Sequence, residues 1–126
     1  MMSDDVNLTM TDLADVAVLV EVAPDSTVSR TVLKAERARL VLFSFDEGQE
    51  LTEHTAAVPV LLQALDGHFE ITAAGRTVDL RPGDVIHLGT RTPHAVVAKA
   101  PSRLLLTMLD PPSPDPCSPS AQVRPV

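Results

Sequence analysis

Apolar and polar residues alternate in short runs along most of the chain, and turn-forming residues separate these runs. Such alternation is typical of half-buried β-strands, and short continuous apolar runs are typical of buried ones. The pattern predicts strands at residues 28–34, 37–45, 58–65, 68–72, 77–80, 85–88, 94–99 and 103–109. An earlier strand from Val16 to Val22 is favoured over a helical turn beginning at Thr11. Closely spaced strands without a long helix indicate an all-β barrel or sandwich.

Glycine and proline mark the expected reversals of the chain. Gly67, Gly75 and Gly83 fall between predicted strands, where a turn often needs a positive φ, so their role is structural. Most prolines before residue 110 also fall at breaks. Pro59 instead stands inside the predicted strand 58–65, which indicates a strand edge or a bulge there.

The chain has room for one domain, which we place at residues 11–110. Residues 1–10 are expected to be loose. Residues 111–126 carry six of the eleven prolines and are interpreted as a disordered tail.

Composition narrows the possible functions. The net charge of -7 argues against nucleic-acid binding and against docking on anionic membranes. The chain has one cysteine, Cys117, so no internal disulfide is expected. No apolar stretch is long enough to span a membrane, and the acidic N-terminus does not resemble a secretion signal. A cytoplasmic location is therefore expected.

Two segments between Gly48 and Ala98 resemble the signature motifs of the cupin superfamily. The matching positions are Gly48, His54 and Gly67 in the first motif, and Gly83 and His94 in the second. The departures are Ala56 at the second histidine, Val60 at the glutamate, Gly89 at the proline, Arg91 at the second glycine and Ala98 at the asparagine. This resemblance implies a cupin-type jelly-roll β-barrel (a double-stranded β-helix), often dimeric.

The resemblance also implies where a metal would lie. Its four ligand positions correspond to His54, Ala56, Val60 and His94, of which only two are histidines. Stable zinc sites use about three or four protein ligands, so His54 and His94 alone should hold a divalent metal weakly. Zinc, nickel, manganese and iron stay open as its identity. The alternative is a pair of partly buried histidines hydrogen-bonded to each other or to the backbone.

Side chains alternate faces along a strand, so residues 54, 56, 58 and 60 should share one face if no bulge intervenes. The resemblance implies that this face looks into the barrel. The predicted inner wall comprises Ala56, Val58, Val60, Leu62, Phe69, Ile71, Ile86, Leu88 and Val96. The predicted ligand pocket comprises His54, Ala56, Val60, Leu62, Phe69, Ile86, Arg91 and His94. Arg91 either pairs with an anionic ligand at the barrel mouth or is a solvent-exposed loop residue.

The remaining polar residues are expected to lie outside this pocket. His87 should face outward, at the surface or a dimer contact, and His68 should be exposed. Gln63 enters the pocket only if a bulge near Pro59 reverses its face.

Three functions stay open at this point. The first is a homodimeric cupin that binds a small molecule in an apolar pocket, with at most a weak two-histidine metal site. The second is a metal-dependent oxygenase or isomerase that completes its coordination with water or substrate. The third is a structural or partner-binding barrel with a filled interior. The motifs identify no catalytic residue.

Overall fold

The computed structural model describes residues 8–112, which form two antiparallel β-sheets preceded by one short 3-10 helix. The helix η1 spans Val16–Leu19. The strands are β1 Thr27–Ala35, β2 Ala38–Phe45, β3 Glu50–His54, β4 Val60–Asp66, β5 Phe69–Ala73, β6 Arg76–Leu80, β7 Val85–Leu88, β8 His94–Ala98 and β9 Ser102–Met108. Most of both predicted loose termini, residues 1–7 and 113–126, lies outside the described residues.

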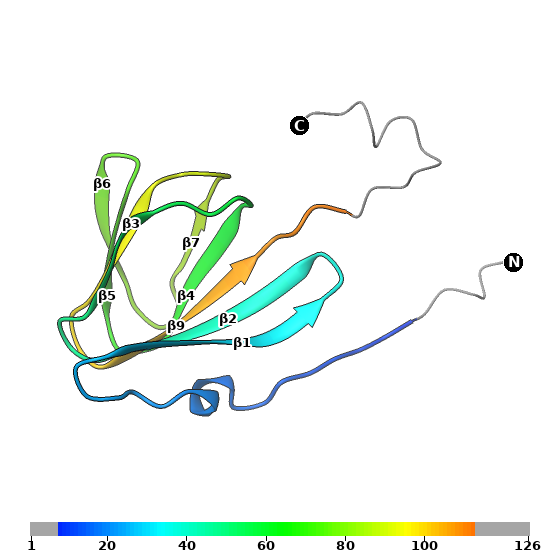
Figure 1. Cartoon of the computed structure of the whole chain (residues 1–126), viewed down its shortest axis with the longest axis horizontal. Coiled ribbons are helices and arrows are strands. Elements are labelled where there is room, and N and C mark those ends of the chain that lie inside the picture. The colour runs from blue at the N-terminus through cyan, green and yellow to red at the C-terminus, as the bar shows by residue number, and fades with distance from the viewer. Residues whose placement is uncertain (1–7, 113–126) are drawn as a thin grey trace, which may run out of the picture.

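The two sheets face each other as the layers of a jelly-roll (Figure 1). One sheet has the strand order β1-β2-β9-β4-β7, and the other has the order β3-β8-β5-β6. Strands distant in the sequence, such as β2 and β9 or β3 and β8, are therefore hydrogen-bonded neighbours. The predicted all-β jelly-roll is confirmed. Among the described residues, no helix has the length and apolar character needed to cross a membrane.

The predicted early strand from Val16 to Val22 is wrong. Val16–Leu19 form a turn of 3-10 helix, which begins after Asp15 at a positive φ of 51°. The carbonyl oxygens of residues 19–21 accept hydrogen bonds from side chains of the strands: Leu19 from Arg30, Val20 from Arg103 and Glu21 from Ser44. These hydrogen bonds take the place of the backbone bonds that a neighbouring strand would make. Val20 is buried but outside the core cluster between the sheets, because the segment lies against the outer face of the five-stranded sheet, to which Ser44 and Arg103 point.

The predicted shared face of residues 54 to 60 is also wrong. β3 ends at His54 in the four-stranded sheet, and β4 begins at Val60 in the five-stranded sheet. The chain crosses between the two layers through residues 55–59, so strand alternation does not continue through them. Pro59 lies in this crossover, where its carbonyl accepts the Leu109 backbone N–H at 3.0 Å.

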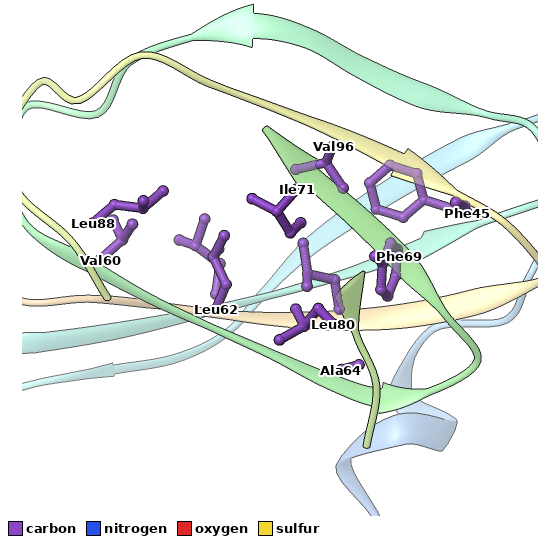
Figure 2. Close-up of a cluster of buried hydrophobic side chains, with 12 residues drawn as sticks. Phe45, Val60, Leu62, Ala64, Phe69, Ile71, Leu80, Leu88 and Val96 are labelled. Atoms are coloured by element: carbon purple, nitrogen blue, oxygen red, sulfur yellow. The ribbon is translucent and has the colours of Figure 1, made fainter. Parts of the chain in front are cut away.

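The core fills the space between the sheets with aliphatic side chains and two buried phenylalanines (Figure 2). The rings of Phe45 and Phe69 meet edge to face, with centroids 5.2 Å apart. Leu62, Phe69 and Leu80 are completely buried. Fully burying one such side chain contributes about 1.5–3 kcal/mol, so this cluster is the main source of stability.

One end of the barrel, which we call the Gly67 end, is closed by a network of polar contacts. Gly67 has a φ of +76°, and a Cβ there would lie 1.9 Å from the Ser102 hydroxyl oxygen. That buried hydroxyl accepts the His68 backbone N–H at 2.9 Å and donates to the Ala100 carbonyl at 2.6 Å. Asp66 accepts both the Arg103 backbone N–H and a guanidinium N–H at 2.7 Å. The turn therefore depends on glycine for both conformation and space.

Candidate functional site

The opposite end of the barrel, which we call the His94 end, carries the two histidines predicted from the motifs. His54 ends β3 and His94 begins β8, and the two residues are directly paired across the strands. Their ring centroids lie 4.3 Å apart, with the ring planes inclined at 56°. His94 is only 2% exposed, whereas His54 is exposed. The predicted meeting of these side chains is therefore present in the structure.

Backbone carbonyls orient both imidazoles in the same way. The Nδ1 atoms of His54 and His94 lie 2.9 Å from the carbonyl oxygens of Thr52 and Thr92, respectively. A carbonyl can only accept a hydrogen bond, so each Nδ1 carries a proton and donates. In the neutral rings the lone pair is then on Nε2. This tautomer can ligate a metal through Nε2, and it is equally suited to accept a hydrogen bond from a ligand.

Burial keeps the inner histidine neutral. The pKa of His94 is lowered from its ordinary value of 6.5, chiefly because burial removes water from the charged form. The hydrogen bond to the Thr92 carbonyl opposes this effect, and the nearby His54 adds to it. At neutral pH the buried ring is therefore an uncharged acceptor.

The donor set does not fit a metal held by the protein alone. Ala56, in the crossover, and Val60, in the core, supply no ligand atoms. Within residues 8–112 no cluster of three or more His, Cys, Asp or Glu side chains has metal-binding geometry. Two imidazoles fall short of the three or four ligands of a stable zinc site. We therefore derive no chemical step through a metal.

The structure distributes the predicted pocket residues over several environments. Val60, Leu62 and Phe69 are at most 1% exposed and belong to the packed core. Ala56 and Ile86 are half-buried against that core. Gln63 is exposed on β4. The sequence pattern identified apolar inward positions correctly, but it could not separate a filled interior from an accessible wall.

Arg91 lies in the loop before β8, as predicted, and is exposed. Its backbone adopts a left-handed conformation with a φ of 59°, and its N–H donates to the Ala56 carbonyl at 2.9 Å. This bond ties the loop to the crossover between β3 and β4.

An open cleft of about 490 Å³ lies between the edge strands of the two sheets, β6 and β7. Its apolar lining includes Ile71 and Leu88 from the core. The full lining is Ile71, Ala73, Ala74, Arg76, Val78, Asp79, Asp84, Val85, Ile86, His87 and Leu88. Of the predicted pocket residues, only Ile86 lines it. Exposed His87 was expected to face outward, and it lies on the rim.

Sequence reasoning missed the polar residues of this cleft, of which Arg76 is the main example. A usable signal was present, because Arg76, Val78 and Leu80 alternate along β6 and therefore share the inner face. What the sequence lacked was the placement of β6 opposite β7.

The sequence matches no protein-family model and no curated protein. Solved structures do match. A cupin superfamily protein from Desulfitobacterium hafniense is 27% identical, with a TM-score of 0.72 over 83% of this chain and 96% of that one. A conserved protein of unknown function from Streptococcus pyogenes is 28% identical, with a TM-score of 0.72 over 89% of this chain and 98% of that one.

A salicylate 1,2-dioxygenase from Pseudoaminobacter salicylatoxidans shares the fold alone. It is 13% identical, with a TM-score of 0.62 over 71% of this chain and 28% of that one. One fold can host unrelated functions, so this likeness does not transfer a reaction. The strand topology and the neighbours that match over almost their full length show that this chain has the fold of cupin superfamily proteins, and its histidine pair lies at two of the four ligand positions that the motifs imply.

Proposed function

We propose that this protein binds a small, largely apolar molecule in the cleft between β6 and β7. The observation that carries the proposal is the cleft itself, whose volume of about 490 Å³ lies within the usual range for ligand pockets. Core side chains such as Ile71 and Leu88 form part of its wall. A ligand there would remove from water the exposed apolar surface of half-buried Val78 and Ile86, and such burial is the main driving force for binding apolar molecules.

The histidine pair lies beside this cleft. His94 is the cross-strand partner of Ala73, and Ala73 lines the cleft. The neutral His94 ring supports a role as hydrogen-bond acceptor for a polar group on the ligand. A weakly bound divalent metal between His54 and His94 belongs to the same proposal, since both Nδ1 atoms are already engaged by carbonyls.

The cleft favours ligand binding over the two other functions predicted from the sequence. A purely structural barrel has no need of an accessible apolar wall. A metal-dependent oxygenase or isomerase would require water or substrate to complete a two-histidine site. Homodimerisation and a cytoplasmic location stay predictions.

The test is to fill the cleft from its wall. Ala73→Leu places a larger side chain at a half-buried position on the inner face of β5. Ala95→Leu is the matched control, because Ala95 is also half-buried but alternates to the outer face of β8. A fragment library is first screened by NMR shift changes of cleft amides. We expect hits to lose affinity in Ala73→Leu and to keep it in Ala95→Leu. Equal binding by both variants would contradict the proposed site.

A further inference from the structure

Four residues form one cross-strand row on the inner side of the four-stranded sheet at the His94 end. His54 pairs with His94, His94 with Ala73, and Ala73 with Arg76. Neighbouring strands are about 4.8 Å apart, so Arg76 lies about 10 Å from His94 across the small side chain of Ala73. The row therefore places the guanidinium group of Arg76 and the imidazole of His94 on opposite sides of Ala73.

Arg76 is the cation best placed to meet a ligand in the cleft. Its side chain alternates to the same face as half-buried Val78 and buried Leu80, and it lines the cleft. Among the described residues it makes no ion pair and no side-chain hydrogen bond, in contrast to Arg39 and Arg103. An arginine in this position presents several N–H donors toward the cleft.

The two carboxylates beside the cleft are engaged elsewhere. Asp79 accepts a hydrogen bond from His68 Nε2 at 2.8 Å and lies 3.9 Å from the Arg81 guanidinium. The hydrogen bond from His68 holds the pKa of Asp79 below its usual range, so this carboxylate stays ionised on its own partners. Asp84 accepts the Arg81 backbone N–H at 3.0 Å. Neither acid is paired with Arg76.

We propose that the cleft takes a small amphipathic carboxylate, whose charged group binds Arg76 and whose apolar body packs on Val78 and Ile86. This inference rests on the proposed function and adds the charge of the ligand. A guanidinium group matches a carboxylate in two parallel N–H···O bonds, which gives orientation as well as affinity. Physiological salt screens charges separated by more than about 8 Å, so those contributions to the net charge of -7 that lie farther than this from Arg76 repel an anion there only weakly.

The assignment to Arg76 differs from the sequence-based expectation for Arg91. Both arginines are exposed at the His94 end, but only Arg76 lines the cleft. This difference provides a matched pair of variants, Arg76→Gln and Arg91→Gln, that remove the same charge from one region.

The experiment compares three probes of the same chain length: hexanoate, 1-hexanol and hexylamine. Each is titrated into the full chain, with dissociation constants and binding positions taken from amide NMR shifts. We expect hexanoate to bind most tightly and to shift the amides of Val78 and Ile86. Arg76→Gln should weaken hexanoate about tenfold, the effect of losing a charge-assisted hydrogen bond. Arg91→Gln should leave its affinity unchanged, and Arg76→Glu should reverse the preference in favour of hexylamine.

Three results would overturn the inference, and the third is distinguishable from the first two. If 1-hexanol binds in the cleft as tightly as hexanoate, or if Arg91→Gln weakens hexanoate as much as Arg76→Gln does, the carboxylate assignment fails while the proposed apolar site stands. If none of the three probes shifts the cleft amides, the proposed site fails with it. Because Arg76 is exposed, its variants should fold, and far-UV circular dichroism checks this.

Discussion

The two ends of the barrel use polar residues in opposite ways. At the Gly67 end, the buried Ser102 hydroxyl bonds to neighbouring backbone groups, and the Asp66 carboxylate bonds to the backbone and guanidinium of Arg103. At the His94 end, the Nε2 atom of His94 has no hydrogen-bond partner among the described residues, and neither does the guanidinium of Arg76. Satisfied buried polar groups fix a structure, whereas open donors and acceptors beside a cleft are available to a ligand. The first end stabilises the fold, and the second carries the proposed site.

The largest expected effect comes from Gly67→Ala. A Cβ at Gly67 would lie 2.5 Å from Ser102 Cβ and 2.8 Å from the Pro101 carbonyl oxygen, and φ is +76°. We expect the free energy of unfolding to fall by about 3 kcal/mol or more.

Gly75→Ala is the control, because it has nearly the same φ, +75°, but nothing within 4 Å of the added Cβ. Its free energy of unfolding should fall by only about 1 kcal/mol, the cost of holding an alanine in the left-handed conformation. Urea unfolding followed by circular dichroism gives both values, since the chain has no tryptophan or tyrosine. Equal losses in the two variants would show that space at the Gly67 end is not limiting.

The next effect is expected from Asp66→Asn. The substitution weakens the hydrogen bonds to the Arg103 backbone and guanidinium, and the partly exposed position limits the loss to about 1–2 kcal/mol. Asp79→Asn is the comparison, because its partners His68 and Arg81 lie on a more exposed surface. It should cost less in the same urea experiment. A larger loss of unfolding free energy in Asp79→Asn would contradict the conclusion that Asp66 contributes more to stability than Asp79.

A smaller effect is expected on acidification, and it reports on the His94 end. Because burial lowers the pKa of His94, the unfolded chain takes up its proton at higher pH than the folded chain does. Stability should therefore fall as the pH drops from about 7 to about 5, and the loss ends below the folded-state pKa.

Chelator-treated protein is used for this measurement, so that metal does not compete with protons. His94→Asn should flatten the pH dependence of the unfolding free energy over this interval, and exposed His87 provides the matched His87→Asn control. An unchanged slope in His94→Asn would exclude His94 as the source.

The smallest expected effect comes from zinc. Two imidazoles should bind it weakly, and a free zinc concentration equal to Kd raises Tm by only about 2 °C whatever the affinity. His54→Ala should abolish this shift, and His87→Ala, at another exposed histidine, should leave it intact. Tight stoichiometric zinc binding that survives His54→Ala would reveal ligands beyond the histidine pair.

The sequence by itself determined the local structure of most of the barrel. Alternation and turn residues were enough to locate strands such as Arg76–Leu80 and Val85–Leu88 and the reversals at Gly67 and Gly75, because these depend on neighbouring residues. The spacing of the motifs also anticipated the meeting of His54 and His94. The apolar run after Val16 predicted a strand that does not form, because side chains of distant strands satisfy its carbonyl groups and leave it outside the sheets.

Only the tertiary structure decided which inward positions line the cleft. Alternation gives the face of a side chain within one strand, but the crossover at residues 55–59 interrupts it and moves Val60 to the other sheet. Whether an inward residue is packed, like Leu62, or accessible, like Ile86, depends on strands far away in the sequence. Arg76 became a candidate ligand contact, in place of Arg91, because β6 lies at the edge of one sheet, across the cleft from β7 in the other.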